Sequence, residues 1–118
     1  MLQEWGLRVD IAPHAVDKLG YLAGTDEARL ADLTDAFLDK NVRAIFTTRG
    51  GKGSYRIAHR MPFDQIANDP KPLIGFSDIT ELQMKLLCEC AARSVHGTLA
   101  GGHNDQFSEI AAPWDMDV

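Results

Sequence analysis

The chain has 118 residues and a formal net charge of −5, with 45% hydrophobic and 25% charged residues. This balance is typical of a single globular domain and excludes global disorder, while the acidic charge argues against a nucleic-acid-binding surface. No apolar run approaches the roughly 20 residues of a membrane helix, and the N-terminus lacks the layout of a signal peptide, so we expect a cytoplasmic protein without membrane contact.

The first half of the chain contains two candidate strands and one helix. Residues 7–12 alternate apolar and polar side chains, which predicts a strand that Pro13 stops. Thr25 is a suitable N-cap for a helix over residues 26–40, where apolar residues recur at helical spacing and the first turn is acidic. Residues 44–48 are apolar and β-branched, which is typical of a strand covered on both faces of a parallel sheet.

A glycine-rich loop follows the second strand, with Gly50, Gly51, Lys52 and Gly53 in succession. Glycines allow the backbone to approach a bound group and to turn its N–H groups toward it. The spacing fits neither a P-loop, which needs Ser or Thr directly after its Gly-Lys pair, nor a dinucleotide-binding fingerprint. Two interpretations remain open: a loop that presents N–H groups to a ligand, and a turn that packs a helix against a strand.

The second half continues the alternation of helices and strands. Residues 54–60 are helix-like, and a short helix is expected between the prolines of residues 61–70. Strands are expected at residues 72–76 and 94–98, on either side of a helix over residues 79–92. That helix has a broad apolar arc typical of core packing, made of Ile79, Leu82, Met84, Leu86, Leu87, Cys90 and Ala91.

Ser77 lies where the strand at residues 72–76 gives way to this helix, so a short turn would lift its side chain above the sheet edge. The positive end of the following helix favours a developing oxyanion there. The pattern is not a full Gly-x-Ser-x-Gly elbow, because Ile79 replaces the second glycine. A structural alternative stays open, in which Ser77 or Asp78 only caps the helix, with Glu81 completing a cap-like pair.

Neither the cysteines nor the histidines predict a metal site or another cofactor. Cys88 and Cys90 are two residues apart on a helix and point about 200° apart around its axis, so buried free thiols are expected. The four histidines have no Cys or carboxylate partner at metal-ligand spacing.

Three stretches together resemble the N-terminal domain of the LD-carboxypeptidase family: residues 44–56, residues 72–80 and the pair His96 and Gly97. The family comprises murein tetrapeptide carboxypeptidases and related microcin C self-immunity peptidases. The resemblance assigns residues 1–100 to this domain and leaves residues 101–118 as a linker or tail. Lys52 departs from the pattern, since the family commonly has an aromatic residue there, and we expect this difference to alter the lining of the pocket.

The resemblance implies an α/β fold with a mostly parallel sheet and helices on both faces, truncated at both ends. It also implies a serine peptidase of peptidoglycan recycling that removes a C-terminal D-amino acid from an L,D-peptide bond, without a cofactor. Ser77 matches the nucleophile, and the backbone N–H groups of Asp78 and Gly51 would form the oxyanion hole. The substrate would be a peptide, either a murein tetrapeptide or a microcin-like peptidyl-nucleotide.

The triad Glu and His of this family come from a C-terminal domain that the chain does not reach, so we interpret the chain as a fragment that is inactive alone. His59 and His96 are the local candidates for the base, but the strict geometry of a triad argues against both, and His96 matches a family position outside the triad. The alternative hypothesis is a non-catalytic binding or pseudoenzyme domain whose exposed edge is covered by another chain, as in a homodimer.

Overall fold

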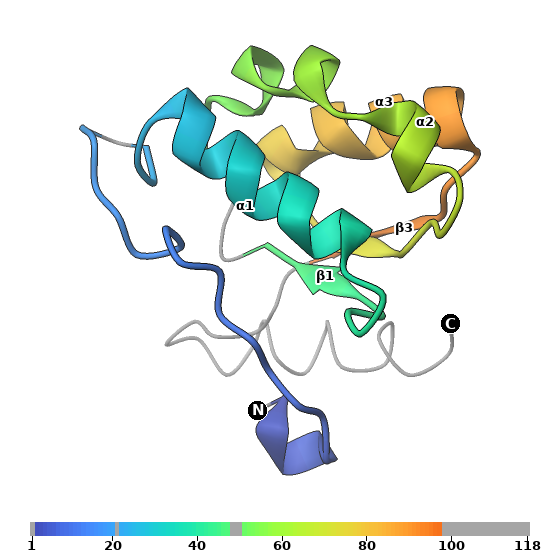
Figure 1. Cartoon of the computed structure of the whole chain (residues 1–118). Coiled ribbons are helices and arrows are strands. Elements are labelled where there is room, and N and C mark those ends of the chain that lie inside the picture. Colours follow the sequence, from blue (N-terminus) through green and yellow to red (C-terminus); the bar gives the residue numbers. More distant parts are fainter. Residues whose placement is uncertain (1, 21, 48–50, 98–118) are drawn as a thin grey trace.

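A three-stranded parallel sheet organises the fold of the computed structural model, which describes residues 2–20, 22–47 and 51–97 (Figure 1). The strands β1 (Ile45–Phe46), β2 (Leu73–Gly75) and β3 (Ser94–His96) lie side by side in chain order. Parallel neighbours require crossover connections, which the helices between the strands provide. The predicted α/β class with a parallel sheet is therefore confirmed.

The described part of the chain also contains three α-helices: α1 (Asp26–Leu38), α2 (Phe63–Ile66) and α3 (Thr80–Cys90). Short 3-10 helices add single turns at Gln3–Trp5, Ser54–Arg56, Ala58–Arg60 and Ser77–Ile79. The predicted N-cap of α1 is confirmed, because the Thr25 hydroxyl accepts a hydrogen bond from the Ala28 N–H at 3.1 Å. No helix in the described part of the chain is long and apolar enough to cross a membrane.

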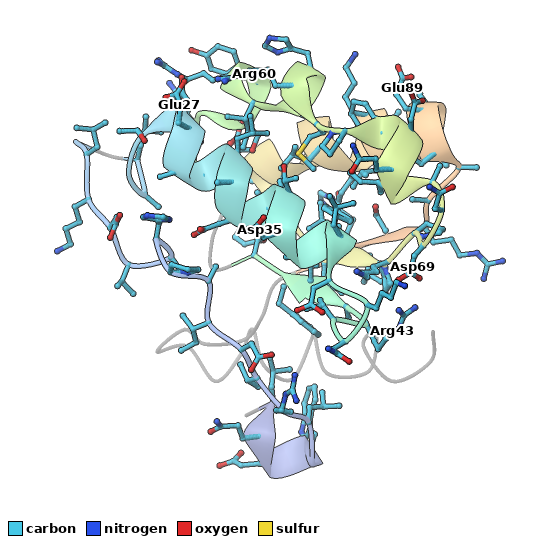
Figure 2. The ribbon with its side chains drawn as sticks, in the orientation of Figure 1. Glu27, Asp35, Arg43, Arg60, Asp69 and Glu89 are labelled. Carbon is cyan, nitrogen blue, oxygen red and sulfur yellow. The ribbon has the colours of Figure 1, made fainter. Side chains whose placement is uncertain are left out.

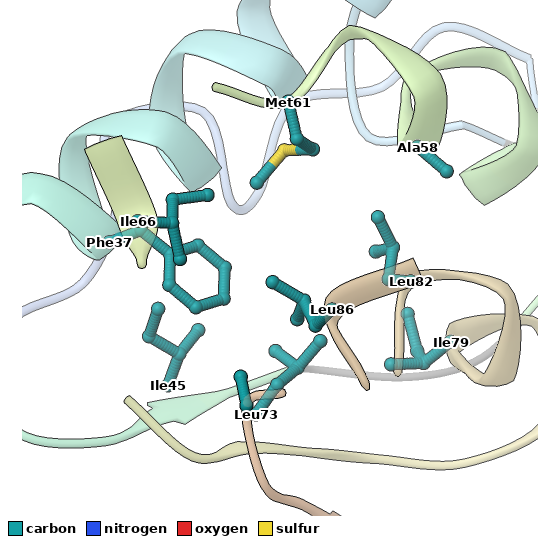
Figure 3. Packing of buried hydrophobic residues seen from close by; sticks show 10 residues of the cluster. Phe37, Ile45, Ala58, Met61, Ile66, Leu73, Ile79, Leu82 and Leu86 are labelled. Atoms are coloured by element: carbon teal, nitrogen blue, oxygen red, sulfur yellow. The ribbon is translucent and has the colours of Figure 1, made fainter. Parts of the chain in front are cut away.

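The hydrophobic core lies between the helices and one face of the sheet (Figure 3). Phe37 of α1, Ile66 of α2, Leu73 of β2 and Leu86 of α3 meet there, and each is at most 1% exposed. Within the described residues all three helices cover this same face (Figure 1), so the second helical layer of the expected fold is not found in that part of the chain.

Lys71 connects the end of α1 to the segment that enters β2, and its side chain is buried. The ammonium group donates to the carbonyl oxygens of Ala36, Phe37 and Asp39. These are carbonyls at the C-terminal end of α1, where the helix dipole favours a cation. The lysine therefore completes the hydrogen bonding of the helix end and joins two layers of the fold.

Two surface ion pairs connect segments that are distant in the sequence, and Figure 2 shows both. Arg60 contacts Glu27 of α1 at 3.2 Å, and Arg43 makes two hydrogen bonds of 3.0 and 3.1 Å to Asp69. The guanidinium of Arg43 lowers the pKa of the Asp69 carboxyl. Exposed ion pairs of this kind contribute little to the free energy of unfolding. They show which distant segments of the chain lie next to each other.

The strand predicted at residues 7–12 is not formed. The segment runs without a paired strand in the described structure, and Leu7 and Ile11 are 49% and 77% exposed. The alternating pattern is present, but a strand also needs a neighbouring strand that accepts and donates its backbone hydrogen bonds.

Part of the expected packing of α3 is also wrong. Met84 and Leu87 are 52% and 55% exposed, and Ala91 is exposed at the helix end. Cys88 is exposed as well, whereas Cys90 is partly buried with its thiol 3.3 Å from the Phe63 carbonyl oxygen. Among the described residues, α3 packs against the core through one side only. Its apolar arc is wider than that buried side, so part of the arc is exposed.

Candidate active site

Ser77 lies at the carboxyl end of β2, where the strand turns sharply into α3. The residue opens the 3-10 turn Ser77–Ile79, which runs directly into α3, and its backbone has φ 58°. Positive φ is uncommon outside glycine and is typical of strained strand-to-helix turns that present a nucleophile. Ser77 is also exposed. The structure thus places this serine where the sequence predicted it, on a tight turn open to solvent.

Gly75 makes room for this turn. A Cβ atom at position 75 would lie 2.4 Å from Thr47 Oγ1 and 2.8 Å from Ile79 Cγ2, which is closer than such atoms approach. Thr47 is held in place by its backbone N–H and its hydroxyl, which both donate to the Ile74 carbonyl oxygen. The glycine therefore allows β1 and the first turn before α3 to close around the end of β2.

The side chain of Asp78 does not cap the helix. Neither the 3-10 turn nor α3 has a side-chain cap, so the structural alternative for Ser77 and Asp78 is wrong. Asp78 Oδ2 instead accepts a hydrogen bond of 2.9 Å from the backbone N–H of Ser54. This contact connects the serine turn to the end of the glycine loop, 24 residues earlier in the chain.

The described part of the glycine loop holds two glycines in backbone conformations that L-residues rarely adopt. Gly51 has φ 127° and is exposed, and a Cβ there would meet no heavy atom within 4 Å. Gly53 has φ 122°, and a Cβ there would lie 2.7 Å from Leu22 Cδ2. Backbone conformation requires glycine at both positions, and packing requires it at Gly53 as well. Gly50 lies outside the described residues.

An ion network on α1 supports the loop from the other side. Arg29 Nη1 donates to the Gly53 carbonyl oxygen at 3.2 Å, and Nη2 of the same guanidinium contacts Asp26 at 2.5 Å. Arg56 also donates to Asp26 at 2.9 Å, and this hydrogen bond is the main cause of the lowered pKa of the Asp26 carboxyl. Arg29 and Ser54 were not predicted as site residues, since no local pattern links them to Ser77.

Neither of the two histidines considered as substitute bases is hydrogen-bonded to the serine in the described structure. His96 Nδ1 lies 3.3 Å from Gln83 Oε1, and His59 is exposed on the 3-10 helix Ala58–Arg60. No hydrogen bond joins either ring to Ser77 within the described residues. That part of the chain also contains no group of three or more His, Cys, Asp or Glu residues able to hold a metal ion.

A cavity of about 230 Å³ adjoins the serine turn, and its lining includes Asp78 and Ile79. Its other walls come from Ala12, His14, Ala15, Leu22 and Ala23 and from residues of α1, β1, α3 and the end of the glycine loop, and they are mainly apolar. Lys52 contributes to the lining of this cavity. His14 and Asp32 also line the cavity, with Nδ1 and Oδ1 2.8 Å apart, and this hydrogen bond raises the pKa of His14.

The sequence of this chain is similar to those of known proteins. The family model described as the LD-carboxypeptidase N-terminal domain matches residues 1–97. A Bacillus subtilis protein named "Probable murein peptide carboxypeptidase" is 39% identical over 98 residues, which is 83% of this chain and 31% of the relative. The "Murein tetrapeptide carboxypeptidase" of Pseudomonas aeruginosa is 34% identical over 113 residues, covering 95% of this chain and 36% of the relative.

A Streptomyces coelicolor relative, named as a carboxypeptidase, is 39% identical over 106 residues, and this match covers 86% of the chain and 34% of the relative. The chain thus spans about a third of the length of the curated relatives that it matches. The family match covers most of the chain and includes β1, the serine turn and β3. The chain belongs to the LD-carboxypeptidase family, as its N-terminal domain.

Proposed function

We propose that the protein is a serine-type LD-carboxypeptidase that removes a C-terminal D-amino acid from murein peptides, with Ser77 as the nucleophile. The observation that carries the proposal is the exposed serine at φ 58° between β2 and α3. The names of the relatives from Bacillus subtilis and Pseudomonas aeruginosa support a murein peptide as substrate. The work of such an enzyme would be the cytoplasmic recycling of cell-wall peptides.

In the proposed reaction, Ser77 Oγ attacks the carbonyl carbon of the L,D-peptide bond. The C–N bond breaks, the D-amino acid leaves after its amine takes up the proton, and water then hydrolyses the acyl ester on the serine. The N–H groups of Asp78 and Gly51 donate to the oxyanion of the tetrahedral intermediate, and the positive end of α3 favours the same charge. Each such donor typically lowers the barrier by about 3 kcal/mol.

A general base must accept the proton of Ser77. By resemblance to the family, we propose a histidine oriented by a glutamate, both in a C-terminal domain that this chain does not include. On this proposal, the 118 residues alone bind peptide without hydrolysing it.

The test replaces Ser77 in the complete protein that carries this chain. Ser77→Ala is expected to lower release of D-alanine from a murein tetrapeptide by about 10⁴-fold or more, because a triad nucleophile has no substitute. Thr80→Ala is the matched control, since it removes an exposed hydroxyl three residues later. A Ser77→Ala variant that keeps its turnover would refute the assignment. The same assay with a peptidyl-nucleotide of the microcin C type separates the two candidate substrates.

A non-catalytic binding domain is the second candidate, because no histidine is hydrogen-bonded to Ser77 in the described residues. On this hypothesis the complete protein binds the tetrapeptide without turnover, and a homodimer would cover the edge strand β1 of the described sheet. Calorimetric binding without D-alanine release, together with sedimentation as a dimer, would favour it. Hydrolysis of the tetrapeptide by the complete protein would exclude it.

A further inference from the structure

The two proposed oxyanion donors belong to segments that are far apart in the sequence. Asp78 lies directly after the serine, whereas Gly51 lies in the glycine loop. An oxyanion hole functions only when its donors are held about 3 Å from the oxygen that gains charge. Some contact must therefore keep the loop in register with the serine turn.

The peptide group between Gly53 and Ser54 is held at both of its polar atoms. Its carbonyl oxygen accepts from Arg29 Nη1 at 3.2 Å and from the Arg56 N–H at 3.1 Å. Its N–H donates to Asp78 Oδ2 at 2.9 Å. Because both ends of one planar group are bonded, that group cannot rotate without losing a hydrogen bond.

The surroundings leave this peptide group little freedom. Ser54 is 5% exposed, and the Asp78 carboxylate is the acceptor of its N–H in the described structure, so loss of that carboxylate removes the hydrogen bond of a largely buried amide. On the other side, the Arg29 guanidinium is anchored by Asp26, which Arg56 also contacts. The end of the glycine loop is thus fixed between α1 and the residue that follows the serine.

We propose that the Asp78 carboxylate is a positioning residue of the active site, a role separate from that of its backbone N–H. By accepting from Ser54, it sets the distance between the serine turn and the loop that supplies the Gly51 donor. The proposal rests on the proposed function, since it assumes that both N–H groups serve one oxyanion. It concerns the side chain alone, so a substitution leaves the backbone donor at position 78 in place.

The test compares three variants in the complete protein. Asp78→Ala is expected to lower kcat about 10- to 100-fold with KM within about 3-fold, because misplaced donors weaken the transition state more than the ground state. Asp78→Asn is expected to stay within about 5-fold of the parent, because its amide oxygen still accepts from the Ser54 N–H. Glu81→Ala removes an exposed carboxylate from the same helix start and is expected to leave kcat unchanged.

Hydrogen exchange of the Ser54 amide provides a readout that does not depend on turnover. In the 118-residue chain, NMR exchange at Ser54 is expected to be at least about 10-fold faster in Asp78→Ala than in Glu81→Ala, because the N–H loses its acceptor. Equal exchange in both variants would overturn the proposal. Should Asp78→Ala not fold, Asp78→Asn decides, and a 10-fold or larger loss of kcat in that variant would contradict it.

The outcomes also separate this inference from the proposed function. Full activity in Ser77→Ala would remove the nucleophile assignment and the positioning role with it. Loss of activity in Ser77→Ala, with Asp78→Ala behaving like Glu81→Ala, would remove only the positioning role. A change in KM alone in Asp78→Ala would also count against it, because alignment of oxyanion donors acts on kcat.

Discussion

Two residues at the end of β2 lie where the backbone conformation or the available space excludes most other residue types. Ser77 adopts a left-handed backbone, and Gly75 lies against atoms that leave no space for a Cβ. Ala91 is the other non-glycine residue with positive φ in the described structure, and there it ends α3. Positive φ alone therefore does not mark a site, and the proposal for Ser77 rests on the combination of positive φ with an exposed hydroxyl at a strand end.

The environment of Gly75 predicts a loss of stability on substitution. Gly75→Ala is expected to lower the free energy of unfolding by about 1–3 kcal/mol, because the added methyl would overlap Thr47 and Ile79. Urea denaturation measures the effect. A second substitution, Thr47→Ala, should recover part of the loss, since it removes the nearer oxygen. A Gly75→Ala protein as stable as its parent would show that the turn is less tightly packed than described.

At the scale of elements, the end of α1 depends on a side chain from outside the helix. Three carbonyl oxygens at or near that end accept from Lys71, and the acidic first turn of α1 is capped by Thr25. The N-terminal cap is local and visible in the sequence. The partner of the C-terminal end, Lys71, is more than 30 residues away from the carbonyl of Phe37, so no local sequence pattern reveals it.

Lys71→Met is expected to lower the free energy of unfolding by about 2–4 kcal/mol, because the carbonyl oxygens at the end of α1 would lose a buried cationic donor. Lys40→Met is the matched control, since Lys40 is exposed just beyond the same helix end. Denaturation of both variants measures the difference. Equal stability of the two would indicate that the buried contacts of Lys71 add nothing to the fold.

At the scale of the whole molecule, one histidine connects the N-terminal segment to α1. His14 contacts Asp32 through its ring and through its backbone N–H, each at 2.8 Å. The ring hydrogen bond raises the pKa of His14, and the charges of Asp32 and Asp17 act in the same direction. A raised pKa in the folded state means that the protonated ring stabilises the fold.

This contribution depends on pH with a definite sign. It is fully present below the unfolded pKa of about 6.5 and is lost as pH rises through the higher folded value. The difference in unfolding free energy between the parent and His14→Gln is therefore expected to be larger at pH 5 than at pH 9. His59→Gln controls for the loss of a histidine, since His59 has no carboxylate partner among the described residues. A difference that does not vary with pH would contradict the expectation.

The placement of Ser77 shows how far sequence patterns lead. The strand before it follows from a short apolar run and the helix after it from apolar periodicity, and the turn between them is short enough to leave the serine exposed. Residues 7–12 show the limit, because the same kind of pattern produced no strand where no neighbour pairs with it. Roles at the site stay predictions, since Gly51 and Asp78 were assigned from resemblance.

The amino-acid sequence by itself determined α1 with its Thr25 cap, the apolar segments that form the three strands and the position of Ser77, because each is written in a local pattern of a few residues. Only the tertiary structure decided the space requirement at Gly75, the buried contacts of Lys71 and the hydrogen bond between Asp78 and Ser54. Those features join residues more than 20 positions apart, or bring neighbouring strands and turns into contact. The packing of the helices on the sheet determines which residues meet in these contacts, and no local sequence pattern specifies that packing.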